Sequence, residues 1–539
     1  MVALLLLPVW TVPGLWYWDI IFWLDTAHRI DFGQIPNVDF FTHLGPLSGY
    51  GLWLMQKLFP SAHPVLAAQL FFSIIGLPLL ALILVDLRSR LQSFLLGGIF
   101  IALLLLPANF FMQVFNFGID LGIHNRQAGL LLYLLIAGLL FVKSSTRLFV
   151  VVTSALLCLL FTKITVFVGA SVLVLYAFLL GRITPKVLIS IVVAIIAAVF
   201  LLQLTTGIFI AYLGDIGRLM DLAGSSASSE IKQDPIHRLA FTIYSRYDLL
   251  IPLGLLVVAA LIEDRHALGN SWSLAREDPL RALRNVLRVD GVALAVLAVV
   301  ALVIESQNSG GQEFAFLVPA VLWIMFRPVR RDFPARAAMF LAAAFLLIVA
   351  IKITHHALLI TSHALNIPRL EAELEPFHLR ARPADVAFAE AKLAFYSANK
   401  EAYAEFASRQ QELAPGLDEG FQLAYFVSVG SAVRAIRRWQ AERKVLLESI
   451  ATLDFVDPFP TLLEMKPVVG LGVVMDPYRT AGQWNTILHA LSMTDGILVP
   501  SCPISDYRYQ YAERAARELE NRRAISIDPC WSLYVKRGL

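Results

Sequence analysis

Long apolar runs recur through the sequence and constrain the fold more than any other feature. A helix needs about 20 apolar residues to cross the hydrocarbon core of a bilayer. Runs near this length occupy residues 2–18, 65–85, 93–112, 127–142, 147–162, 164–180, 187–207, 247–262, 290–304, 313–326 and 337–354. Only 16% of the residues are charged, whereas soluble domains have about 25%. The sequence therefore predicts a polytopic α-helical membrane protein with about eleven transmembrane helices.

The loops between the runs alternate in charge, which predicts the orientation of the chain. Short loops rich in Lys and Arg, such as 86–90, 181–186 and 327–336, alternate with polar loops that contain few of either. Cytoplasmic loops of membrane proteins have the excess of Lys and Arg. We therefore expect a cytoplasmic N-terminus, with loops 19–64 and 113–126 on the external face. The formal net charge of +3 gives no indication of nucleic-acid binding.

Two further segments have the pattern of surface helices. Residues 207–224 place Phe209, Leu213, Ile216 and Met220 near one helical face, which predicts an interfacial amphipathic helix or, for the first half, a continuation of the preceding span. Residues 276–288 space Arg among Leu and Val, which is typical of a helix attracted to anionic lipid headgroups. Membrane lipids are therefore expected partners.

The composition changes after the last run, so we expect residues 1–354 to form a transmembrane domain and 355–539 a small external α/β domain. Strong helix formers fill its first part. Short strands are predicted at 468–475, 496–500 and 524–527, with helices at 481–493 and 507–521 between them. Cys502 and Cys530 lie in this domain and can pair as a disulfide in an oxidising compartment.

The first external loop contains more charged residues, and more Gly and Pro residues at fixed spacing, than a simple connection between helices needs. Asp19 ends the first run, where a carboxylate can act as a general base or hold a positive group. On position alone it is an interfacial acid that marks a helix end. The residues that follow are Asp25, Ala27, Arg29, Gly33, Pro36, Asp39, Phe40, Gly45, Pro46 and Leu47.

In order and spacing, these residues resemble the first external loop of the GT-C superfamily of membrane glycosyltransferases. The similarity is to the bacterial branch with protein mannosyltransferases and the lipid A aminoarabinose transferase. Those loops run from an acidic residue through Ala-x-Arg and Gly-x-x-Pro to Asp-Phe and Gly-Pro-Leu or Pro-Pro-Leu. The resemblance implies a GT-C-like fold in a bacterial inner membrane, with the external domain in the periplasm.

The resemblance also implies roles for the loop's charged residues. Asp19 takes the place of the catalytic aspartate, and Arg29 is expected to contact substrate. Many relatives have Asp-Glu where this chain has Asp19-Ile20, which keeps Asp25 open as the working acid. Asp39 ranks behind both, either as a substrate contact or as a residue that shapes the loop by bonding nearby backbone N–H groups.

Other polar residues at span edges are further candidates for the site. Family members often have a second functional acid after the third helix, and Asp120 is the acid of loop 113–126. Arg126 offers a fork of donors suited to phosphate, with His124 and Asn125 beside it. Alternatively, Asn125 caps a helix and Arg126 snorkels.

Lys163 lies at an external turn, where it can pair with a donor phosphate or snorkel to the interface. Gln307 and Glu313 lie at the edges of the next polar turn, 305–314, and can bond sugar hydroxyls. A polar turn with a Gly-Gly bend explains these two residues equally well.

The chain has no Walker motif, HExxH or Gly-rich phosphate fingerprint at a strand–helix junction. An enzyme outside the cytoplasm has little access to nucleotide sugars, and the resemblance implies a polyprenyl-phosphate sugar as donor. The predicted function is transfer of that sugar, with inversion, to a hydroxyl of a glycolipid, lipopolysaccharide or polysaccharide. The alternative is a transporter or flippase for a lipid-linked glycan. Some relatives use a divalent metal, but no ligand set for one is evident here.

Overall fold

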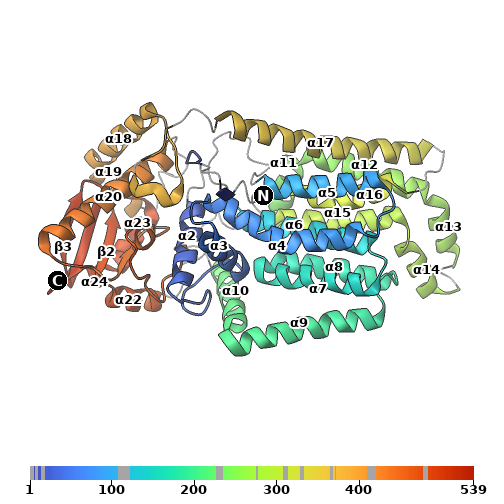
Figure 1. The fold of residues 1–539 in the computed structure, drawn as a ribbon, viewed down its shortest axis with the longest axis horizontal. Coiled ribbons are helices and arrows are strands. Elements are labelled where there is room, and N and C mark those ends of the chain that lie inside the picture. Colours follow the sequence, from blue (N-terminus) through green and yellow to red (C-terminus); the bar gives the residue numbers. More distant parts are fainter. Residues whose placement is uncertain are drawn as a thin grey trace.

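The computed structural model describes residues 5–6, 10–13, 18–106, 122–225, 235–274, 277–307, 313–327, 333–363, 368–370, 372–409, 420–476 and 484–539. Figure 1 shows a bundle of long helices along the longest axis of the molecule, with the C-terminal domain at one end of it. We call the end of the bundle that faces this domain the domain end, and the opposite end the far end.

The bundle confirms the prediction of a polytopic helical membrane protein. In the described residues, five helices are long and apolar enough to span a bilayer, or up to seven if two bent helix pairs each form one span. The five are α4 (Pro64–Leu84), α6 (Ile123–Phe141), α7 (Ser145–Thr162), α9 (Pro185–Thr206) and the first part of α17 (Phe333–His363). The bent pairs are α11 (Pro235–Ser245) with α12 (Tyr247–Glu263), and α14 (Pro279–Leu287) with α15 (Asp290–Ser306).

Shorter apolar helices complete the bundle: α5 (Arg90–Leu105), α8 (Ile164–Leu179), and η1 (Glu313–Leu317) with α16 (Val318–Met325). Each predicted run from 65–85 onward falls wholly or largely on one of these elements, whereas run 2–18 lies mostly outside the described residues. Burial separates the centre from the periphery, because 83% of the apolar window of α6 is buried and only 6% of that of α9. Apolar side chains that face out of a helix without protein contacts suit a lipid environment.

The described residues of the loops rich in Lys and Arg lie at the far end (Figure 1). Arg147 pairs with Asp86 at 2.6 Å, which joins two of these loops. Arg327 pairs with Asp290 at 2.6 Å and also with Glu263. Helices α13 (Arg265–Leu274) and α14 lie at this end in Figure 1, so the charge alternation in the sequence corresponds to two opposite ends of the bundle. Segment 276–288 is largely helical, as predicted.

Short helices form the junction at the domain end. They are α2 (Trp18–Asp31), α3 (Pro46–Leu58) and α10 (Ile208–Ser225). Gly207 ends α9 in the left-handed region, at φ 71°, where a residue with a Cβ is strained. This break makes α10 a separate helix, as the amphipathic pattern predicts, rather than a continuation of the span.

The C-terminal domain combines helices with a small sheet, as predicted. Its helices are η2 (Ala372–Phe377), α18 (Pro383–Ala398), α19 (Lys400–Ser408), α20 (Phe421–Arg443), α21 (Phe459–Leu462), α22 (Trp484–Met493), α23 (Asp506–Arg514) and α24 (Ala516–Glu520). Its strands are β1 (Ile450–Thr452), β2 (Gly496–Pro500), β3 (Arg522–Asp528) and β4 (Trp531–Lys536), in the order β1-β2-β4-β3. Strands β1 and β2 are parallel, and the other pairs are antiparallel.

One predicted strand is wrong. Segment 468–475 forms no strand, although it is apolar, because its backbone bonds elsewhere. The Gly470 N–H donates to the carbonyl of Asp39 at 2.8 Å, and the Val473 N–H donates to that of Phe41 at 3.2 Å. Leu471 and Met475 of this segment are buried in the core of the C-terminal domain, so the segment is apolar without being a strand, which a pattern in the sequence cannot reveal.

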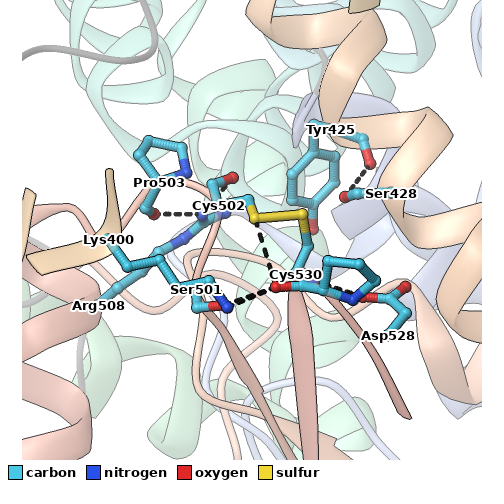
Figure 2. The surroundings of a disulfide bond; sticks show 10 residues. Lys400, Tyr425, Ser428, Ser501, Cys502, Pro503, Arg508, Asp528 and Cys530 are labelled. Carbon is cyan, nitrogen blue, oxygen red and sulfur yellow. Dashed lines mark hydrogen bonds between the residues drawn. A yellow bond between two sulfur atoms is a disulfide. The ribbon is translucent and has the colours of Figure 1, made fainter. Parts of the chain in front are cut away.

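The predicted disulfide between Cys502 and Cys530 is present, with their Cα atoms 4.9 Å apart. Figure 2 shows how it joins the segment after β2 to the turn between β3 and β4. The Ser501 N–H donates to the Cys530 carbonyl at 2.8 Å, and Arg508 donates to the carbonyl of Pro503 at 2.8 Å. The disulfide therefore lies in a part of the domain that is also held by hydrogen bonds.

Candidate functional site

The first external loop meets the start of α6 at a buried point of the domain end. Asp19 lies in the first turn of α2 and is 3% exposed. Its carboxylate accepts a hydrogen bond of 2.9 Å from the N–H of Gly122, the residue that precedes α6 with φ 80°. Asp19 thus contacts the segment just before His124, Asn125 and Arg126. Asp120 lies outside the described residues.

The first turn of α6 brings further predicted residues to this point. Asn125 is buried, and its Oδ1 accepts a hydrogen bond from Lys163 Nζ. Lys163 lies between α7 and α8. Arg126 is fully buried, so its guanidinium lies in protein and does not snorkel to solvent. The capping alternative is also wrong, because Gly122 is the N-cap of α6.

A network of ion pairs adjoins this point on the other side. Arg246, between α11 and α12, pairs with Glu313 at 3.2 Å. Lys352 of α17 pairs with Glu313 at 3.0 Å and with Asp248 at 2.8 Å. Glu313 is 1% exposed and has φ 48°. A non-Gly residue in this conformation stores backbone strain, which proteins retain mainly at functional sites.

Glu305, at the end of α15, connects the two groups. It is 8% exposed and interacts electrostatically with both Lys163 and Arg246. Polar residues of loops 19–64 and 113–126, of the turn at Lys163, of the ends of α12, α15 and η1, and of α17 therefore form one cluster, which we call the ionic site. Its members are Asp19, His43, His124, Asn125, Arg126, Lys163, Arg246, Asp248, Glu305, Glu313 and Lys352.

Asp25 and Arg29 lie apart from the ionic site, in a contact with the C-terminal domain. Their side chains pair at 2.9 Å and are each 1% exposed. Arg29 also donates to the carbonyl of Val468 at 2.7 Å. Burial raises the pKa of Asp25, although the charge of Arg29 acts against this. Burial also raises the pKa of Asp457 to about 7, with Asp25 as a further cause.

A narrow cleft borders this contact. It is lined by Arg29, Thr452, Asp454, Phe455, Val456, Asp457, Leu471, Gly472 and Met475. Most of these residues belong to the C-terminal domain, so α2 and the domain share its walls. The cleft is separate from the hydrogen bond between Asp19 and Gly122.

Asp39 has the loop-shaping contact that its position predicts. Its Oδ2 accepts a hydrogen bond of 2.6 Å from the Ile35 N–H. Gln307, in contrast, is exposed at the end of α15, where its side chain donates to Ser306 Oγ at 3.5 Å. Gln307 thus lies outside the buried part of the ionic site.

Sequence reasoning missed His43, Arg246, Asp248, Glu305 and Lys352 as members of the ionic site. Lys352 had a signal, because it interrupts apolar run 337–354 and a Lys at membrane depth is costly. Arg246 and Glu305 lie at the edges of runs, where an ionisable residue is unremarkable. His43 had no signal in the pattern, because its role depends on contacts with other elements.

The described residues contain no group of three or more His, Cys, Asp or Glu side chains that could hold a metal ion. The cationic side chains of the site include Arg126, which is fully buried, and Lys163, which bonds to a buried amide. Charges in such surroundings interact more strongly than in water. The ionic site can therefore bind an anion and stabilise negative charge that develops on it.

Comparisons with known proteins find a likeness in fold. No family model matches the sequence, and neither does any curated protein. The crystal structure of ArnT from Cupriavidus metallidurans in the apo state has 12% identity and a TM-score of 0.43. The same protein bound to undecaprenyl phosphate has 12% identity and a TM-score of 0.44. Each match covers 99% of this chain and 96% of the other.

Proposed function

We propose that this membrane protein transfers a sugar from a polyprenyl-phosphate donor to an acceptor hydroxyl at the domain end, on the periplasmic face. The observation that supports the proposal best is the hydrogen bond from Gly122 to Asp19. It brings the acid of the first loop together with the first turn of α6, where Arg126 is buried and Asn125 bonds to Lys163. A base and phosphate-binding cations are thus at one point.

The donor phosphate binds at Arg126 and Lys163. A guanidinium offers several donors in a fork that fits phosphate oxygens, and an ammonium adds a mobile point charge. The N-terminus of α6 contributes the positive end of the helix dipole. As the bond between sugar and phosphate breaks, charge accumulates on the leaving polyprenyl phosphate, and these groups stabilise it.

Asp19 acts as the general base. Its carboxylate accepts the proton of the acceptor hydroxyl while the hydroxyl oxygen bonds to the anomeric carbon. The bond from that carbon to the phosphate oxygen breaks, and polyprenyl phosphate leaves with the electron pair. Because one displacement occurs without an enzyme nucleophile, the anomeric centre is inverted. The hydrogen bond from Gly122 holds the carboxylate in place.

Asp25 is a weaker choice for the base. Both acids are buried, but Asp19 lies beside the first turn of α6, whereas Asp25 pairs with Arg29 at 2.9 Å in the contact with the C-terminal domain, apart from the ionic site. The proposal names the acceptor as a class, a glycan or lipid that carries a hydroxyl group. A glycolipid, lipopolysaccharide or a polysaccharide belongs to this class.

The arrangement of charges favours transfer over transport. Transporters usually bind substrate near the bilayer midplane between broken helices. In the described residues, the ionic site gathers at the domain end, and the break between α11 and α12, bent by 95°, adjoins it through Arg246. A site at one membrane face suits chemistry that starts and ends on that face.

The test compares wild type with Asp19→Asn in nanodiscs, using a panel of undecaprenyl-phosphate sugars with labelled sugar. We expect the variant to lose roughly 10²–10⁴-fold in transfer rate while it still binds undecaprenyl phosphate. Asp31→Asn is the matched control, because Asp31 is an acid of the same loop that pairs with Lys57 at the surface. Full activity of a folded Asp19→Asn variant refutes the role of Asp19.

Two outcomes with wild type address the function itself. If wild type neither binds nor turns over any donor in the panel, polyprenyl-phosphate glycosyl transfer is wrong. If it moves the labelled donor between leaflets of a vesicle without transferring sugar, the flippase alternative replaces it.

A further inference from the structure

Three polar groups of the ionic site have no hydrogen-bond partner among the described residues. Glu305 is 8% exposed, and no hydrogen bond or ion pair to its carboxylate is found there. The Nδ1 atoms of His43 and His124 are buried and have no hydrogen-bond partner. Buried polar groups are usually hydrogen-bonded, so three such groups in one place indicate that a ligand supplies the partners.

All three groups interact electrostatically with Lys163. His124 interacts electrostatically with Lys163, His43 and Arg126. Glu305 interacts with Lys163 from the opposite element, α15. They come from the loop before α3, the first turn of α6 and the end of α15, so only the folded chain brings them together.

Their chemistry excludes phosphate as the common ligand. A carboxylate repels a phosphate, whereas it accepts hydrogen bonds from O–H and N–H groups. Burial lowers the pKa of His43 to about 4, and the charge of Lys163 contributes, so this imidazole is neutral near pH 7. A neutral imidazole offers one donor and one acceptor nitrogen, which suits hydroxyl groups. The ring of His43 packs against Phe22 with centroids 5.6 Å apart, which orients it.

We propose that His43, His124 and Glu305 bind the sugar of the lipid-linked donor, through its hydroxyl groups or, in an amino sugar, through its ammonium group. This inference rests on the proposed function, because the phosphate at Arg126 and Lys163 places the attached sugar beside these three residues. It adds to that function the residues that distinguish one donor sugar from another.

The test separates sugar binding from phosphate binding. The Michaelis constant is measured for one neutral hexose donor and one amino-sugar donor, each on undecaprenyl phosphate, and Kd is measured for undecaprenyl phosphate without sugar. The variants are Glu305→Ala, Glu305→Gln and His43→Phe, which keeps an aromatic ring against Phe22. Glu405→Gln is the control, because Glu405 lies on the surface of α19.

We expect Glu305→Ala and His43→Phe to raise KM for the accepted donor at least 10-fold while Kd for undecaprenyl phosphate stays within 2-fold. Glu305→Gln keeps an acceptor oxygen but loses the charge. If Glu305→Gln raises KM for the amino-sugar donor alone, the ligand of Glu305 is an ammonium group. If it raises KM for the hexose donor, but less than Glu305→Ala does, the ligands are hydroxyl groups.

Three results overturn the inference. If the variants weaken binding of undecaprenyl phosphate as much as they raise KM, Glu305 and His43 act through Lys163 and not on the sugar. If KM does not change in folded variants, they do not touch the sugar. If wild type binds undecaprenyl phosphate but accepts no sugar donor, or binds neither, the proposed function itself has failed, which the wild-type measurements alone reveal.

Discussion

Removing Arg29 tests whether the contact between α2 and the C-terminal domain depends on a buried ion pair. The Arg29 side chain is 1% exposed, pairs with Asp25 at 2.9 Å and donates to the Val468 carbonyl at 2.7 Å. Arg29→Met keeps the length of the aliphatic chain and removes every donor. Asp25 is then left buried without its cation. Breaking a buried pair from one side costs about 3–5 kcal/mol.

The double variant Asp25→Asn/Arg29→Met separates the charge of Asp25 from the other lost contacts. It has no charge at either of these two buried positions, so the remaining loss is mainly the hydrogen bond to Val468 and some packing, about 1–2 kcal/mol. We therefore expect the double variant to be about 2–3 kcal/mol more stable than Arg29→Met alone. The free energy of unfolding is measured by tryptophan fluorescence during titration of mixed micelles with sodium dodecyl sulfate. Equal losses in the two variants refute the reasoning, because the unpaired carboxylate would then cost nothing.

Three further perturbations probe other parts of the structure. Gly45→Ala places a Cβ 2.2 Å from the Phe161 carbonyl oxygen and should cost at least ~1–3 kcal/mol in the same titration. Gly33→Ala, at φ 80° with no neighbouring atom within 4 Å, should cost only the ~1–2 kcal/mol of left-handed strain. Similar losses of stability in the two variants contradict this reasoning. Replacing both cysteines of the disulfide, which are 28 residues apart, should cost about 3–4 kcal/mol, and dithiothreitol should lower the Tm of wild type but not of the variant. Because the folded pKa of Asp457 is about 7 and its ordinary value 3.8, its stabilisation is complete below about pH 4 and is lost as pH rises to 7, by up to about 4 kcal/mol. Asp457→Asn should flatten this dependence, and an unchanged slope would contradict it.

The membrane part of the fold could be predicted because its signal is local. A span is a continuous apolar run, and loop charge reports its orientation without reference to any partner. The error at 468–475 has the same origin. An apolar run of that length is compatible with a buried strand, but here the Gly470 and Val473 N–H groups bond to the first loop. The sequence of an apolar run does not determine which partner the run packs against.

The site could be predicted only in part, for a related reason. Asp19 stands out through the motif of its loop, Arg126 through a fork of donors suited to phosphate, and Lys163 through its place between two apolar runs. Their grouping depends on contacts between distant residues, such as the hydrogen bond between Asp19 and Gly122, which are 103 positions apart. Glu305 becomes informative only when its burial and its lack of a described partner are known. Periodicity and composition contain neither fact.

The polar residues of the first loop fix its position on three sides. Asn37 donates to Asp215 of α10 at 2.9 Å, and the carbonyl of Asp39 accepts from Gly470 of the C-terminal domain at 2.8 Å. At the third side the Gly45 N–H donates to the Thr162 carbonyl at 3.3 Å, an approach that a Cβ would block.

A base must be held close to its productive geometry for catalysis to be efficient. Loops usually lack such rigidity, and here it comes from three separate parts of the chain. Burial raises the pKa of Asp215 to about 6, so near pH 7 its carboxylate is mostly ionised and accepts the Asn37 donor. The side chains that anchor the loop and the carboxylate proposed for catalysis are therefore different residues, so a variant at Asn37 should impair transfer without removing any group that touches the substrate.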